Sequence, residues 1–151
     1  MERKIRNSVK ALIMKEGKML AIKLDDDGDV FYTMPGGGQN AGETLTAALK
    51  REVAEEIGVD VVPQSLEFVI EGVYGEAFHR VDLIFLCEYV GLVDNSILQR
   101  EDSQVRYEWL DIEHLNNHPL YPSKLRKQII RLSKGEKTDM YLGNEEPGDP
   151  E

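Results

Sequence analysis

The sequence predicts a layered domain of the α/β (α+β) class. β-forming segments precede one strong helical pattern, further β-forming segments follow it, and a second helical pattern lies near the C-terminus. Each such element has an apolar face, so strands and helices in this order bury those faces against one another in layers. With 151 residues, the chain is long enough for one domain with a substantial core.

The first third of the chain is expected to form three strands. Residues 8–14 and 19–24 are rich in apolar β-formers and are separated by a short polar turn, which predicts a hairpin. An acidic turn over residues 25–29 leads to a third short strand at 30–34. After Pro35 the chain enters a run of three glycines, which is expected to be a loop with exposed backbone groups.

The central helix is expected between Thr44 and Gly58. Thr44 is a favourable N-cap residue, although Ala47 at the third helical position means that there is no capping box. Gly58 is a natural helix stop. Apolar residues that recur every four positions predict the face packed on the sheet: Leu45, Leu49, Val53 and Ile57.

Three carboxylates gather near the end of this helix: Glu52, Glu55 and Glu56. At about 100° per residue they share one arc next to the apolar stripe, which places them at an edge of the core. Their mutual repulsion favours a bound divalent cation, and carboxylate oxygens are usual ligands of Mg²⁺ and Mn²⁺. The competing interpretation is a solvated acidic helix face, which is common on surface helices.

The second half of the chain is expected to contain three more strands and two helices. The strands are expected at residues 66–75, 80–90 and 105–110, and the middle one is apolar enough to be buried on both faces. A short helix capped by Asp111 follows the last strand, and a longer helix is expected over residues 122–133.

The last helix is expected to be amphipathic. Its inward residues are Leu125, Ile129, Ile130 and Leu132, and its outward residues are Lys124, Arg126, Lys127 and Arg131. The periodicity is lost after this helix, so we expect the domain to span residues 1–142. Residues 143–151 are expected to form a disordered acidic tail.

Composition limits the partners of the protein. The formal net charge of −10 argues against binding to nucleic acid or to an anionic membrane. No apolar run approaches the roughly 20 residues that a membrane-spanning helix needs, and the start of the chain does not resemble a signal peptide. The single cysteine, Cys87, lies in an apolar run and is expected to be a buried, inert thiol in a reducing compartment. A cytoplasmic location is therefore expected.

The segment 37–59 resembles the Nudix box of the Nudix (MutT-like) hydrolases. Every signature position is matched, and the matching residues include Gly37, Glu43, Arg51, Glu52, Glu55, Glu56 and Gly58. The resemblance implies a helix–mixed sheet–helix sandwich and hydrolysis of a nucleoside diphosphate linked to another moiety, with Mg²⁺ or Mn²⁺ as cofactor. It also implies a small-molecule nucleotide as substrate, and homodimers are common in the family.

The resemblance assigns metal binding to Glu52, Glu55, Glu56 and the backbone carbonyl of Gly37. Glu55 is also a candidate for the base that orients the attacking water. Glu43 and Arg51 are expected to hold the metal-binding carboxylates in place. In some relatives the base comes from a loop outside the box, and the loop candidates here are Glu76, Glu101 and Asp102.

The substrate is not specified by the box, because the surrounding loops determine it. The leading expectations are an ADP-ribose-like compound and a (deoxy)nucleoside triphosphate. Candidates for stacking on a base are Tyr32, Phe78 and Trp109, although aromatic side chains more often belong to the core. Candidates for contact with phosphate or sugar are Lys23, His79 and Arg80.

A second function class is a Nudix domain that senses nucleotides without hydrolysing them. Such domains usually accompany a DNA-binding segment or have a decayed box. This chain shows neither feature, because its box is intact and it has no basic recognition helix. The sequence therefore favours the enzyme.

Overall fold

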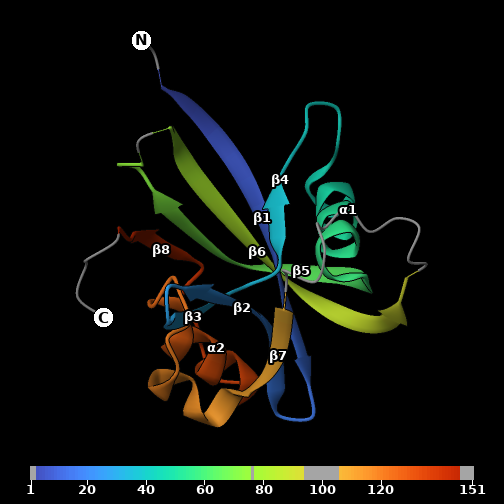
Figure 1. The fold of residues 1–151 in the computed structure, drawn as a ribbon, viewed down its shortest axis with the longest axis vertical. Coiled ribbons are helices and arrows are strands. Elements are labelled where there is room, and N and C mark those ends of the chain that lie inside the picture. Colours follow the sequence, from blue (N-terminus) through green and yellow to red (C-terminus); the bar gives the residue numbers. More distant parts are fainter. Residues whose placement is uncertain (1–2, 76, 94–105, 147–151) are drawn as a thin grey trace.

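The computed structural model describes residues 3–75, 77–93 and 106–146, and it shows a mixed sheet with helices on both faces (Figure 1). Its elements are β1 (Lys4–Lys15), β2 (Lys18–Asp26), β3 (Asp29–Thr33), β4 (Gly36–Gly38), α1 (Leu45–Ile57), β5 (Val59–Gly72), β6 (Phe78–Leu92), β7 (Arg106–Asp111), the 3₁₀-helix η2 (Ile112–Asn117), α2 (Leu125–Ser133) and β8 (Tyr141–Asn144). This arrangement confirms the α/β class and the sandwich with a mixed sheet.

Strand β1 is the centre of the sheet. The strands follow the order β3-β2-β1-β6-β5-β8, while β4 pairs with β1 and β7 pairs with β2. The pairs β1–β6 and β5–β8 are parallel, and the other pairs are antiparallel. Neighbouring residues of a strand face opposite sides of a sheet, so β1 supplies side chains to both layers.

Helix α1 covers one face of the sheet. Leu49 and Val53 of the helix are fully buried and pack with Val9 and Ala11 of β1 and with Phe85 of β6. Cys87 also belongs to this cluster, which confirms that the thiol is buried, and burial raises its pKa to about 12.

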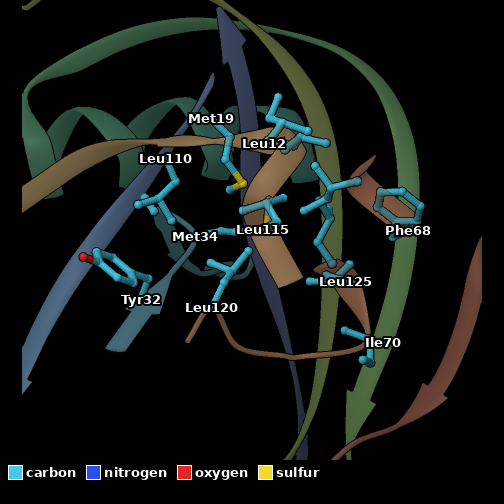
Figure 2. Close-up of a cluster of buried hydrophobic side chains, with 14 residues drawn as sticks. Leu12, Met19, Tyr32, Met34, Phe68, Ile70, Leu110, Leu115, Leu120 and Leu125 are labelled. Atoms are coloured by element: carbon cyan, nitrogen blue, oxygen red, sulfur yellow. The ribbon is translucent and has the colours of Figure 1, made fainter. Parts of the chain in front are cut away.

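The opposite face is covered by η2 and α2 (Figure 2). Leu12, Phe68 and Ile84 of the sheet meet Leu115 of η2 and Ile129 of α2, and all five side chains are fully buried. Full burial of each large apolar side chain stabilises the fold by about 1.5–3 kcal/mol. The two clusters together fix the sheet between its helices.

The boundaries of α1 agree with the sequence prediction. Thr44 is the N-cap, and its hydroxyl accepts a hydrogen bond from the Ala47 N–H at 3.1 Å. Gly58 ends the helix in the left-handed conformation, with φ of 70°. This is a conformation that glycine adopts without the steric cost of a Cβ atom.

The glycine run is a strand, and the expectation of an exposed loop is wrong. Gly36, Gly37 and Gly38 form β4 and pair with Lys10, Val9 and Ser8 of β1. At φ of +149°, a Cβ on Gly36 would lie 1.9 Å from the Val9 carbonyl oxygen. The missing side chains thus permit a close approach of two backbones, which composition alone does not reveal.

Strands β1 and β6 are longer than expected because pairing extends them into polar sequence, and β5 is longer because it also includes residues 59–62. β1 begins at Lys4, where it pairs with Phe78 at the start of β6. β5 begins directly after α1 and continues through Pro63, with register shifts on either side of that residue. β6 is most buried between Asp82 and Cys87 and becomes exposed towards its end, so burial on both faces holds only for its middle.

Two details of the C-terminal helices differ from the prediction. Asp111 makes no side-chain cap to η2, which is a 3₁₀-helix rather than an α-helix. Arg126 is buried, although its position predicted an outward side chain. Its Nε donates to the Leu120 carbonyl at 2.8 Å and its guanidinium lies 5.0 Å from the centre of the Tyr121 ring, which compensates the loss of water.

The expected tail begins inside the folded structure. Gly143 and Asn144 belong to β8, which pairs with β5. The Glu145 carboxylate accepts hydrogen bonds from the backbone N–H groups of Ser123 and Lys124 at 2.7 and 2.9 Å. The prediction of disorder is therefore wrong for residues 143–146, and residues 147–151 lie outside the described part of the chain.

None of the described helices is both long and apolar enough to cross a membrane.

Candidate functional site

The carboxylates of α1 meet the glycines of β4 at one end of the helix. An ideal Cβ on Gly37 would lie 2.2 Å from Oε2 of Glu52, so the Glu52 carboxylate occupies the space that a side chain would fill. The Gly36 N–H donates to Oε1 of Glu56 at 3.0 Å. The predicted neighbours Gly37, Glu52 and Glu56 are thus brought together.

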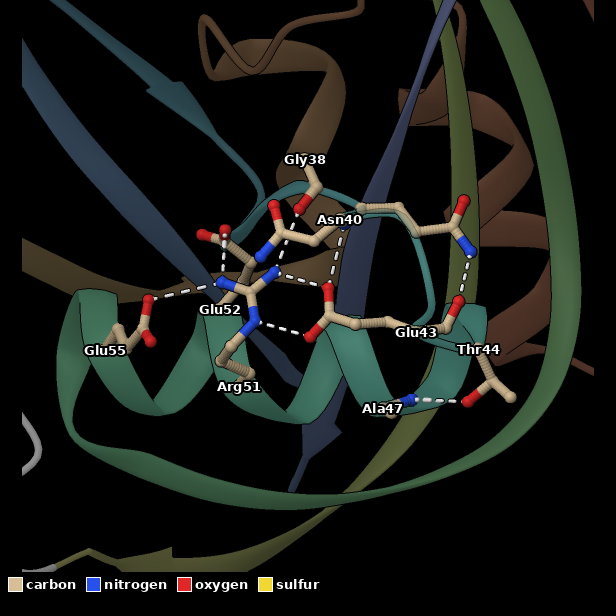
Figure 3. Close-up of polar contacts among 9 residues, drawn as sticks. Gly38, Asn40, Glu43, Thr44, Ala47, Arg51, Glu52 and Glu55 are labelled. Carbon is tan, nitrogen blue, oxygen red and sulfur yellow. Dashed lines mark hydrogen bonds and ion pairs between the residues drawn. The ribbon is translucent and has the colours of Figure 1, made fainter.

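Arg51 connects the carboxylates on the outer side of the helix (Figure 3). Its guanidinium donates to both oxygens of Glu43, at 2.6 and 2.8 Å, and to Oε1 of Glu52 at 2.8 Å. It also donates to Oε2 of Glu55 at 3.3 Å and to the Gly38 carbonyl at 3.1 Å. The Arg51 guanidinium therefore holds the carboxylates of Glu43, Glu52 and Glu55 and the end of β4 in a fixed arrangement.

The pKa values of two of the carboxylates are shifted in opposite directions. The Arg51 guanidinium and the Asn40 N–H lower the pKa of Glu43 to about 2. Burial raises the pKa of Glu56, although the Gly36 N–H and the charge of Lys10 oppose the rise. Glu43 is consequently fixed as an anion by its partners, whereas Glu56 has to be stabilised as an anion by a nearby positive charge.

The chemistry of the donor set suits a hard divalent cation. Within the described ranges, Oε2 of Glu52, Oε1 of Glu55 and Oε2 of Glu56 receive no hydrogen bond, so one oxygen of each remains for a ligand. In the same ranges no three acidic, histidine or cysteine side chains lie close enough together to hold a metal ion as they stand. Carboxylate oxygens are the donors that Mg²⁺ and Mn²⁺ prefer, and here they are positioned by Arg51 and the Gly36 N–H rather than by one another.

A large cleft lies on the α2 side of the sheet. Its volume is about 800 Å³, and it is lined by Lys10, Asp26, Phe31, Thr33, Met34, Arg80, Asp82, Ile84, Tyr121, Pro122, Leu125, Glu145 and Glu146. Lys10 pairs with Gly36 across the β1–β4 contact, and its charge acts on Glu56. The cleft therefore reaches the backbone that carries the carboxylate site.

The cleft has an aromatic wall and an ion pair. The rings of Phe31 and Tyr121 meet edge to face with their centres 6.5 Å apart. Arg80 Nε donates to Oδ2 of Asp82 at 2.9 Å. Phe31, the Arg80–Asp82 pair and Tyr121 come from three segments far apart in the sequence, and of the four only Arg80 was predicted as a site residue. Only their shared position over the sheet face shows that they form one surface.

The predicted stacking residues lie elsewhere. Tyr32 is a core residue whose hydroxyl donates to Glu108 at 3.0 Å. Trp109 packs against Tyr89 with ring centres 5.8 Å apart. Phe78 lies under the guanidinium of Arg6, 5.5 Å from the ring centre. None of these three aromatic residues is among those that line the cleft.

The structure places some of the other residues predicted to contact substrate or act as a base, and others lie outside the described residues. Lys23 pairs with Glu108 at 3.1 Å, and His79 contacts Glu71 at 2.8 Å, so both have protein partners. The loop candidates for a catalytic base, Glu76, Glu101 and Asp102, lie outside the described residues.

Comparison with known proteins identifies relatives of the chain. A family model described as the NUDIX domain matches residues 4–132. The nucleoside triphosphatase NudI of Escherichia fergusonii is 38% identical over 64 residues, which are 40% of this chain and 45% of that protein. The ADP-ribose pyrophosphatase of Methanocaldococcus jannaschii is 26% identical over 134 residues, 85% of this chain and 75% of that protein. The match thus spans less than half of the first relative's length.

Solved structures share the fold. The Escherichia coli ORF135 protein superposes with a TM-score of 0.72 at 18% identity and covers 91% of this chain and 96% of its own. A MutT protein from Methanosarcina mazei gives a TM-score of 0.65 at 25% identity, with 89% of this chain and 97% of its own covered. These likenesses concern the arrangement of the sheet and helices described above.

Proposed function

This chain belongs to the NUDIX domain family, and on that premise we propose that it is a metal-dependent pyrophosphohydrolase. Its reaction is hydrolysis of the pyrophosphate bond in a nucleoside diphosphate linked to another moiety. The observation that carries this proposal is the meeting of Glu52 and Glu56 with the glycine strand β4 next to a cleft large enough for a nucleoside.

The residues that would hold Mg²⁺ or Mn²⁺ are Glu52, Glu55, Glu56 and the carbonyl of Gly37. When bound, the cation supplies charge neutralisation at the phosphate oxygens and a water of lowered pKa. Cleavage of a pyrophosphate needs positioning and charge stabilisation rather than a covalent intermediate, so a set of fixed carboxylates suits the reaction.

Arg51 and Glu43 act as positioning residues. Arg51 uses Nε and Nη2 on Glu43 and Nη1 on Glu52 and Glu55, so it fixes the direction of the carboxylates from behind. We assign to Glu55 either a ligand position or the orientation of the attacking water. Its contact with Arg51 is the longest of the set, at 3.3 Å, which leaves it the most freedom to turn.

Lys10 brings positive charge to the junction of the cleft and the carboxylate site. It lines the cleft, and its charge opposes the rise in the pKa of Glu56. In a chain with a net charge of −10, a polyphosphate needs such local cations to approach. Lys10 is therefore placed to attract the phosphate chain towards the site of hydrolysis.

The substrate is proposed to be an ADP-ribose-like compound or a (deoxy)nucleoside triphosphate. The similarity to an ADP-ribose pyrophosphatase over 85% of this chain supports the first class. The higher local identity to nucleoside triphosphatases supports the second. Both classes carry a nucleoside next to a pyrophosphate bond, and a cleft that adjoins a carboxylate site supports a substrate of this kind.

A substrate panel tests the proposal. The purified protein is incubated with nucleoside triphosphates, ADP-ribose and other nucleotide sugars in Mg²⁺ or Mn²⁺, and the products are separated by ion-exchange chromatography. We expect metal-dependent release of a nucleoside monophosphate from at least one class. Nucleotide binding without turnover of any compound would instead support a sensor domain.

A further inference from the structure

The cleft contains a buried acceptor that the protein itself leaves unused. The Asp82 side chain is 4% exposed, and its Oδ2 accepts a hydrogen bond from Arg80 Nε. Its Oδ1 is buried and has no hydrogen-bond partner in the described part of the chain. An unpaired carboxylate oxygen in the interior is costly, so a donor from outside the protein would stabilise this position.

Arg80 provides a donor next to this acceptor. Its guanidinium lies against Gly72, where an ideal Cβ would be 2.8 Å from Nη2 and 3.1 Å from Nη1. The bare glycine therefore makes room for the guanidinium at the wall of the cleft. Within the described residues Arg80 donates only through Nε, so its Nη groups are available to an acceptor on a ligand.

The walls around the pair suit a flat heterocycle. Phe31 and Tyr121 contribute aromatic surface, and Met34 contributes apolar surface, to the same cleft. A planar ring between such walls would present its polar edge to the acceptor and donor of the Asp82–Arg80 pair.

We propose that Arg80 and Asp82 recognise a nucleobase edge with an exocyclic amino group beside an unprotonated ring nitrogen, as in adenine and cytosine. Asp82 Oδ1 accepts from the amino group, and an Arg80 Nη group donates to the ring nitrogen. Uracil and hypoxanthine present a carbonyl oxygen and a ring N–H at these positions, so both hydrogen bonds would be mismatched. This selectivity rests on the proposed function, because it assumes that the cleft holds the nucleoside of the substrate.

Binding of nucleoside monophosphates tests the selectivity without any hydrolysis. Isothermal titration in the absence of metal compares CMP with UMP and AMP with IMP, since the two members of each pair differ only along this edge. We expect CMP and AMP to bind tighter than their partners by about tenfold or more. Equal affinities, a reversed order, or no binding of any of the four would overturn the assignment.

The variant Asp82→Asn gives a second and sharper test. The amide can offer an N–H where the carboxylate only accepts, so the preference should fall to near unity or turn towards UMP and IMP. The matched control is Asp29→Asn, which makes the same change at an exposed residue of β3 outside the cleft lining and should keep the wild-type ratios. A wild-type ratio in a folded Asp82→Asn protein would contradict the proposal.

These measurements are independent of the reaction. If Asp82→Asn does not fold, as judged by its thermal unfolding, the wild-type pairs of monophosphates decide the question by themselves. A wild-type protein that hydrolyses nucleotides but does not discriminate between the paired bases would refute the base recognition and leave the proposed function standing. A protein that discriminates between the paired bases but hydrolyses no nucleotide would support the base recognition and refute the proposed function.

Discussion

The Glu52 carboxylate lies where Gly37 would carry a side chain, with Oε2 2.2 Å from an ideal Cβ at that position. Gly37 is held in β4 by its pairing with Val9, so it cannot move aside without disturbing the central strand of the sheet. A backbone position in one strand therefore sets the position of a carboxylate on a helix.

Replacement of Gly37 by alanine should displace the Glu52 side chain. We expect hydrolytic turnover to fall by roughly 100-fold, because a shift of about 1 Å in a positioned group has effects of this size. The added methyl group should also cost about 1–3 kcal/mol of unfolding free energy through overpacking. Steady-state kinetics and thermal unfolding measure the two effects.

Gly91→Ala is the matched control for this substitution. Gly91 also lies in a strand, but an ideal Cβ there has no heavy atom within 4 Å. Its turnover and melting temperature should stay close to the wild-type values. If Gly37→Ala turned over as fast as Gly91→Ala, the contact between Gly37 and Glu52 would have no role in the site.

Glu56→Gln should abolish most of the turnover while the fold stays intact. The glutamine retains an oxygen to accept the Gly36 N–H, but it removes the negative charge that a cation requires. We expect a loss of roughly 100-fold or more. Burial raises the pKa of Glu56, so the neutral glutamine should unfold at the wild-type temperature or slightly above it.

The exposed Glu88 of β6 provides the control for charge removal. Glu88→Gln makes the same chemical change on the surface, and its turnover should match that of the wild type. Normal hydrolysis by a folded Glu56→Gln protein would show that this carboxylate is not a metal ligand.

The ion pair between Arg51 and Glu43 should appear in the acid stability of the protein. The pKa of Glu43 is lowered from 4.5 to about 2, chiefly by Arg51. A lowered pKa means that the folded state binds the proton less readily than the unfolded state, so the stabilisation is complete above pH 4.5 and is lost as the pH falls towards 2. Arg51 is the charged group that contacts Glu43.

Unfolding curves of the wild type and Glu43→Gln over this pH range measure the effect. The difference in melting temperature between the two proteins should be largest near neutral pH and should shrink steadily as the solution is acidified. A difference that stays constant from neutral to acid pH would mean that the carboxylate of Glu43 does not contribute through its charge.

Sequence reasoning was most successful where the structure depends on local pattern. The bounds of α1 follow from Thr44, Gly58 and the four-residue spacing of apolar residues, because caps and periodicity act within a few turns of chain. The carboxylates of the helix were identified for the same reason, since their spacing places them on one arc.

Long-range pairing explains most of what the sequence did not reveal. The strand character of Gly36–Gly38 depends on Val9, and the start of β1 depends on Phe78 in another strand. The buried Arg126 depends on the Leu120 carbonyl and on a ring that packs beside it. These partners lie outside the elements whose residues they contact. Local propensity therefore predicts an exposed loop for Gly36–Gly38 and an outward side chain for Arg126.

The cleft was also hidden by distance along the chain. Phe31, Asp82 and Tyr121 come from three separated segments and share only one face of the sheet. The local sequence marks Phe31 and Asp82 as ordinary strand residues and Tyr121 as a residue between elements. The fold itself is required before their proximity can be recognised.

The alternation of side chains along β1 has a consequence for how such a protein can be diversified. Val9 and Ala11 belong to the layer under α1, whereas Lys10 lines the cleft on the other side of the same strand. If the cleft binds the nucleoside as proposed, substitutions confined to the cleft layer should alter which nucleotides are accepted while the helix layer keeps its packing. The two faces of β1 could then change independently. Residues on the helix face would keep the packing of α1, which carries the carboxylates, while residues on the cleft face would change the substrate preference.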